Sequence, residues 1–87
     1  MNWKTNKNSL IDSYLKVQPD LILMNSHGLK STEALRIPGY KIHKLNYSEN
    51  YADGSAIAIK YNIPHKIYDD YETDVLAVEI GTIVLGL

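Results

Sequence analysis

Apolar positions in the first part of the chain recur at the three- and four-residue spacing of a helix. This spacing predicts an amphipathic helix over residues 7–17, and Asn6, Asn8 and Ser9 offer N-cap oxygens near its start. Pro19 disfavours helical backbone at Gln18, so the helix should end there. The predicted apolar face consists of Leu10, Ile11, Tyr14, Leu15 and Val17.

A continuous apolar run, Leu21 to Met24, follows the helix directly. A short run of this kind is typical of a strand that is buried on both faces. It stops abruptly at the polar residues 25–28, which read Asn-Ser-His-Gly. We expect a loop over residues 25–38, in which residues 31–33 open a single helical turn.

The rest of the chain predicts short strands separated by polar turns, over residues 40–45, 56–59, 66–68, 75–80 and 82–87. In residues 56–59 the isoleucines point one way and the alanines the other, so this strand should be central in its sheet. The alanine face calls for close contact, as from a packed helix. Asp53-Gly54 is predicted to form a tight turn, and Gly81 a hairpin.

Length and composition predict one small globular domain of the α+β class with mostly antiparallel strands. The chain has 87 residues, of which 45% are hydrophobic and 22% charged, and its net charge is -1. It contains no cysteine, which excludes disulfides and cysteine-based metal sites. Its apolar runs are only a few residues long, whereas a membrane span needs about 20, so no membrane partner is expected. The balanced charge does not indicate nucleic-acid binding.

Four segments in this order carry a family resemblance: QPDLILMNSHGLK, IPGYKIHK, DGSAIAIKYNIPHK and DVLAVEI. Together they resemble the endonuclease domain of non-LTR (LINE-type) retrotransposons, a member of the endonuclease/exonuclease/phosphatase superfamily. The resemblance implies an apurinic-endonuclease-like fold, here a partial two-sheet sandwich flanked by helices. It covers nearly the whole chain but only the N-terminal portion of such a domain.

The resemblance also implies a function. The family nicks DNA by Mg²⁺-assisted phosphodiester hydrolysis to prime reverse transcription, so DNA, a reverse transcriptase domain of the same polyprotein and a nuclear target are implied. A carboxylate at the end of the second strand holds the metal ion, which stabilises charge on the phosphate. The matching positions here are Asn25, Ser26 and His27, which the resemblance places at the rim of the active site. Ser26 occupies the glutamate position, and a neutral hydroxyl is a poor ligand for a hard cation.

Other parts of the family pattern have no counterpart in this sequence. Its first strand would lie before Met1, and its later Asp-x-Asn and Ser-Asp-His motifs would lie beyond Leu87. We therefore expect residues 1–87 to form a single partial domain that lacks the first strand and the C-terminal half and is inactive alone. The alternative is a non-catalytic module, derived from such a domain, that binds protein or nucleic acid.

The remaining candidate residues have ordinary structural interpretations beside functional ones. Ser26 and His27 are adjacent, so on a strand they point to opposite faces and do not suit a nucleophile pair. His43 and His65 lack the spacing of metal ligands and are expected to be surface or hydrogen-bonded residues. An acidic connecting loop is formed by Asp69, Asp70, Glu72 and Asp74. A DNA-contacting basic face would use Lys41, Lys44, Lys60 and Lys66, with base stacking on Tyr47 and Tyr51. Trp3 is expected to be a packing residue.

Overall fold

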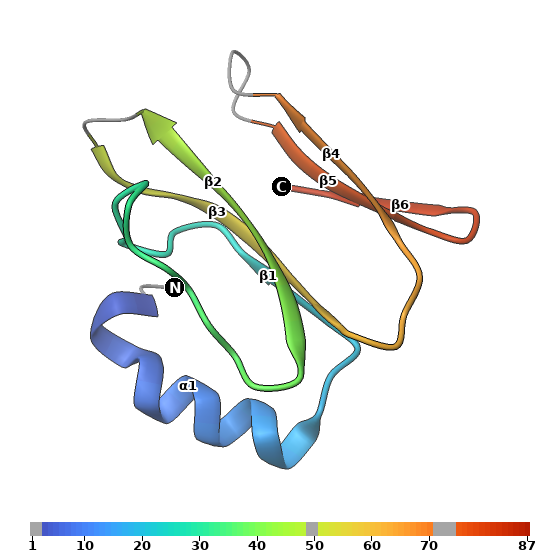
Figure 1. The fold of residues 1–87 in the computed structure, drawn as a ribbon, viewed down its shortest axis with the longest axis horizontal. Helices are drawn as coiled ribbons and strands as arrows, with labels where there is room; N and C mark the ends of the chain where they lie inside the picture. Colours follow the sequence, from blue (N-terminus) through green and yellow to red (C-terminus); the bar gives the residue numbers. More distant parts are fainter. Residues whose placement is uncertain (1–2, 49–50, 71–74) are drawn as a thin grey trace.

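The computed structural model describes residues 3–48, 51–70 and 75–87 (Figure 1). In these residues one helix is followed by strands, which confirms the α+β class. The elements in chain order are α1 (Trp3–Val17), β1 (Leu21–Met24), β2 (Tyr40–Ser48), β3 (Tyr51–Lys60), β4 (Lys66–Asp70), β5 (Val75–Ile80) and β6 (Ile83–Gly86). No helix in this part of the chain is long and apolar enough to cross a bilayer.

The strands form two antiparallel sheets of three strands each. The first sheet has the order β1-β3-β2 and the second the order β4-β5-β6. The central position predicted for residues 56–59 is therefore confirmed, because β3 pairs with both of its neighbours. The prediction for residues 21–24 was wrong in one respect. β1 is an edge strand, and Leu23 is 37% exposed although it pairs with Ile57 and lies on the face toward the second sheet.

The two faces of β3 belong to two different cores, and this determines the layering of the molecule. Ala56 and Ala58 lie in a cluster that includes Trp3 and is covered by the apolar residues of α1. Their small side chains let the helix approach the sheet, as the sequence predicted. Ile57 and Ile59 point the other way and pack between the two sheets. The result is a helix, a sheet and a second sheet in succession (Figure 1).

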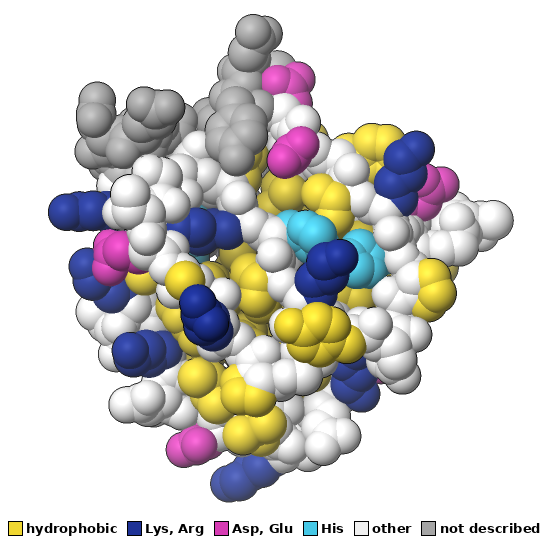
Figure 2. Space-filling model, in the orientation of Figure 1, with side chains coloured by type: hydrophobic (Ala, Val, Ile, Leu, Met, Phe, Trp, Pro, Cys, Tyr) yellow, Lys and Arg dark blue, Asp and Glu magenta, His cyan; other side chains and the backbone are white. Residues whose placement is uncertain are grey.

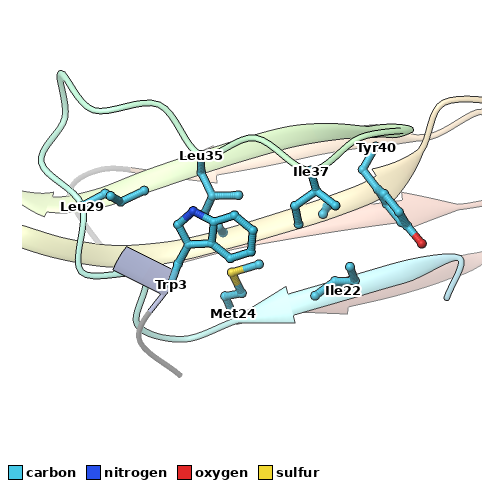
Figure 3. Close-up of a cluster of buried hydrophobic side chains, with 9 residues drawn as sticks. Trp3, Ile22, Met24, Leu29, Leu35, Ile37 and Tyr40 are labelled. Carbon is cyan, nitrogen blue, oxygen red and sulfur yellow. The ribbon is translucent and has the colours of Figure 1, made fainter. Parts of the chain in front are cut away.

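The core beneath α1 is closed partly by the loop between β1 and β2. Figure 3 shows the indole of Trp3 beside the Met24 side chain, with loop residues Leu29, Leu35 and Ile37 nearby. These five side chains are at most 5% exposed. Burial of this much apolar surface is the main favourable term that holds the loop and the helix against the sheet.

The helix differs from its prediction at its start and on one of its sides. It begins at Trp3 rather than at residue 7, because the buried Trp3 anchors an additional first turn. Leu10, Ile11 and Tyr14 pack on the core, as predicted. Leu15 and Val17 were placed wrongly on this face, since their side chains are 47% and 75% exposed.

The tight turn predicted at Asp53-Gly54 was also wrong. Both residues lie within β3, and Gly54 pairs with Asn46 of β2. Glycine is required there by close backbone approach, because an added Cβ would lie 1.9 Å from the carbonyl oxygen of Leu45. The hairpin at Gly81 is confirmed, with a positive φ of 61°. Residues 31–33 form a non-helical turn, so the single turn of helix predicted there was wrong.

Candidate functional site

The end of β1 is the place where the sequence predicted an active-site rim. Asn25 is exposed and Ser26 is half-buried. The pairing of Met24 with Ala56 places the start of β3 beside the residues that follow β1. The backbone N–H of His27 accordingly donates to the carbonyl oxygen of Gly54 over 3.1 Å. The polar loop after β1 and the residues around Asp53 therefore form one continuous site.

Asp53 is the charged centre of this site. The Ser26 hydroxyl donates a hydrogen bond to Asp53 Oδ2. The backbone N–H groups of Gly28 and Gly54 donate to Asp53 Oδ1 over 2.9 Å and 2.8 Å. Burial alone would raise the pKa of Asp53, but these three hydrogen bonds favour the carboxylate and together hold its pKa below the ordinary value. The carboxylate thus fastens the loop after β1 to β3.

His27 lies inside the protein rather than at the rim predicted for it. It is fully buried, and both of its ring nitrogens are bonded to backbone groups. The Leu29 N–H donates to Nδ1 over 2.9 Å, so Nδ1 must be unprotonated. Nε2 therefore carries the hydrogen and lies 3.3 Å from the Leu45 carbonyl oxygen. In this geometry neither nitrogen is available to a substrate.

The residues at the end of β1 do not fit the Mg²⁺ ion that the family resemblance implies. Mg²⁺ is usually held by one or two carboxylates that keep oxygen positions open for it. Ser26 offers a neutral hydroxyl, and the oxygens of Asp53 already accept three hydrogen bonds. Within the described part of the chain, no group of three His, Cys, Asp or Glu side chains could enclose a metal ion.

The lysines that could contact DNA are mostly engaged with the protein itself. Lys44 Nζ donates to the carbonyl oxygens of Lys30 and Glu33 over 2.6 Å and 2.5 Å, and burial lowers its pKa. Lys60 lies 3.5 Å from a carboxylate oxygen of Asp20, and Lys66 lies over the ring of Tyr68. Figure 2 shows Lys and Arg side chains dispersed over the visible face, with acidic side chains among them.

Several other candidates fall at or beyond the limits of the described residues. Asp69 and Asp70 lie at the exposed end of β4, whereas Glu72 and Asp74 lie outside the described residues. Tyr47 and Tyr51 belong to β2 and β3 by their backbone, but their side chains are outside the described part. The prediction that these tyrosines stack on bases therefore stays a prediction.

The two remaining histidines form a pair, which their separation in the sequence did not indicate. His43 comes from β2, and His65 lies in the segment between β3 and β4. Their Nε2 atoms are 3.0 Å apart, and their ring planes meet at 75°. The expectation that they are hydrogen-bonded is confirmed for both, because His65 Nδ1 also lies 2.9 Å from the Ile63 carbonyl oxygen.

Two residues of the site were missed by reasoning from the sequence. Asp53 was assigned to a turn, although the glycine after it marks a close backbone approach rather than a reversal of the chain. Asn46 is buried, and its amide donates to the Leu29 carbonyl oxygen over 2.7 Å. The signal that was available is a polar residue within an otherwise apolar strand pattern.

The chain was compared with protein families, curated proteins and solved structures. No protein-family profile, no curated protein and no solved structure matches the chain. Its class is therefore defined by the fold alone, as a small α+β domain with one helix and two antiparallel three-stranded sheets in the described residues. The residues at the end of β1 and the surface pair of histidines are the two candidate functional sites of this fold.

Proposed function

We propose that this chain is part of an endonuclease domain of the non-LTR retrotransposon type, with the apurinic-endonuclease-like fold of the endonuclease/exonuclease/phosphatase superfamily. In its complete form such a domain nicks DNA to prime reverse transcription. DNA and the reverse transcriptase of the same polyprotein are the partners that follow from this proposal. The 87 residues alone do not cleave DNA.

One observation carries the proposal: Ser26 lies half-buried at the end of a strand, directly beside a carboxylate from the neighbouring strand. A metal-dependent phosphodiesterase needs an acidic residue at such a strand end, facing solvent and the scissile phosphate. The resemblance puts the metal-binding glutamate at position 26. The layered order of helix, sheet and sheet is also what a sandwich flanked by helices requires.

The same geometry supports the inactivity of the chain. With a hydroxyl at position 26 and Asp53 held by three donors, the site lacks a free carboxylate for a hard cation. His27 is enclosed and cannot act as a base on a water molecule. The chain's own residues therefore shape and fasten the strand end, and they supply no proton acceptor for hydrolysis.

The assignment of position 26 can be tested by restoring the carboxylate. In Ser26→Glu, two carboxylates would lie side by side at the strand end, and Mn²⁺ should broaden the amide resonances of Gly28 and Gly54. The matched control is Ser13→Glu, which adds the same charge to the exposed side of α1. The wild type and the control should show no selective broadening there. Equal broadening in Ser26→Glu and Ser13→Glu would refute the assignment.

The inactivity is tested separately with supercoiled plasmid. Incubation with the wild-type chain and Mg²⁺ should give no more nicked circles than buffer alone. Asp53→Asn serves as a control for contaminating nuclease, since a contaminant acts equally in both preparations. Mg²⁺-dependent nicking by the wild type that disappears in Asp53→Asn would show that the chain is catalytic and that Asp53 takes part.

A further inference from the structure

We propose that His43 and His65 form a two-ligand site for a borderline divalent transition-metal ion, with Zn²⁺ as its test ion. Imidazole nitrogen is a preferred ligand of such ions, whereas the hard Mg²⁺ prefers oxygen. The site lies apart from the strand end that the proposed function uses. It rests on different residues, so either proposal can fail without the other.

The separation of the two nitrogens suits a shared ion. Zn²⁺ binds histidine nitrogen at about 2.0–2.1 Å, so two ligands at right angles are about 2.9 Å apart and two tetrahedral ligands about 3.4 Å apart. The two Nε2 atoms are 3.0 Å apart, between these values. The ring centroids are 5.1 Å apart, so the nitrogens are on the facing sides of the rings. With the hydrogen of His43 moved from Nε2 to Nδ1, slight rotation of the rings would aim both Nε2 lone pairs at one ion.

His65 is already held in the form that a metal ion requires. Its Nδ1 lies 2.9 Å from the Ile63 carbonyl oxygen, which can only accept a hydrogen bond, so Nδ1 carries the hydrogen. The lone pair of a neutral His65 is therefore on Nε2, which faces His43. A backbone carbonyl that fixes the tautomer in this way is the usual second partner of a metal-binding histidine.

The position of His43 leaves the pair accessible to an ion from solvent and places it on the side of the first sheet that faces the second. His43 pairs with Ile57, so its side chain is on the face of the first sheet that looks toward the second sheet. Both histidines are half-buried rather than enclosed. Figure 2 shows histidine side chains next to one another on the surface of the visible face. Burial lowers the pKa of His43, a shift in the direction that favours the neutral form.

The proposal is tested by calorimetric titration of the full chain with ZnCl₂ at neutral pH. One ion should bind per chain, and His43→Gln and His65→Gln should each weaken binding by at least about tenfold. Lys41→Arg, on the same strand, keeps the positive charge that acts on His43, and as the matched control it should bind as the wild type does. Circular dichroism should show that all variants keep the fold.

A measurement on the unmodified chain guards against variants that fail to fold. Zn²⁺ should shift the Nε2 resonances of His43 and His65 in ¹⁵N spectra and leave those of the buried His27 unchanged. Binding that survives in the double variant His43→Gln/His65→Gln would overturn the proposal. Absence of binding with a Kd of about 1 mM or tighter in the wild type would overturn it as well.

Discussion

His27 shows how a single side chain can hold together backbone segments that are distant in the sequence. Its ring connects the loop after β1, through the Leu29 N–H, to β2, through the Leu45 carbonyl oxygen. Only the neutral tautomer with hydrogen on Nε2 satisfies both partners, because a protonated Nδ1 would face the Leu29 donor. Burial is the main reason that the pKa of His27 lies below its ordinary value.

This tautomer predicts a loss of stability in mild acid. Because the pKa of His27 is lower in the folded chain than in the unfolded chain, the unfolded chain takes up the proton first as the pH falls below about 6.5. The free energy of unfolding should therefore have its full value above that pH and should decrease below it. The decrease due to this one group is at most about 1.4 kcal/mol per pH unit. Urea unfolding between pH 7.5 and 5 measures it.

His43 is the necessary control for that measurement, because its pKa is lowered as well and acts in the same direction. In His43→Gln the remaining pH dependence should be that of His27. In His27→Gln the dependence should shrink, although the variant is less stable at every pH because backbone partners of the ring are left unpaired. A pH dependence in His27→Gln equal to that of the wild type would contradict the role assigned to His27.

At the scale of single elements, the pairing of β2 with β3 depends on one glycine. The two strands approach so closely at Gly54 that a methyl group there would overlap the Leu45 carbonyl. Gly54 is also the link between β3 and the site, because its N–H donates to Asp53 and its carbonyl accepts from His27. A defect at this position therefore affects the sheet and the strand end together.

Gly54→Ala should consequently lower the free energy of unfolding by more than about 2 kcal/mol, since backbone would have to move to relieve the overlap. The matched control is Gly86→Ala in β6, where the added Cβ would lie 3.5 Å from the Cβ of Ala77, an ordinary contact. That control should change stability by less than about 0.5 kcal/mol. Urea denaturation of the three proteins gives both values, and similar losses in the two variants would contradict the interpretation.

The elements differ in how well the sequence alone predicted them, for identifiable reasons. Residues 21–24 were placed correctly because they are an apolar run between Asp20 and Asn25, and residues 75–80 because a mostly apolar segment ends at Gly81. The start of α1 was missed because Trp3 acts through tertiary burial, which periodicity does not record. Asp-Gly is a common turn sequence, and only the cross-strand contact with Leu45 reveals that this pair lies inside a strand. The hydrogen bonds of Asp53 likewise join segments that the sequence keeps far apart.

For the whole molecule, stability depends on two cores that share the strand β3. The core between the sheets is small and includes Leu76 and Val78 of β5, which are at most 1% exposed. In contrast, β6 presents Ile83 and Val84 to the outside, each 61% exposed. The second sheet is therefore held to the first mainly through β5.

Leu76→Ala should accordingly cost about 2–5 kcal/mol, because it removes a buried side chain from the contact between the sheets. Leu85→Ala in β6 is the matched control. Its side chain is 37% exposed, and its loss should cost less than about 1.5 kcal/mol. Thermal or urea unfolding checks both values. Equal costs would mean that the sheets do not pack through β5 as described.

The alternation of alanine and isoleucine along β3 also limits which insertions and deletions this strand can accept. A slip of one residue against its partners would exchange the two faces. Isoleucines would then collide with the helix layer, while alanines would leave voids between the sheets. Single-residue insertions or deletions within residues 55–60 should therefore be tolerated far less well than substitutions, and changes of two residues better than changes of one.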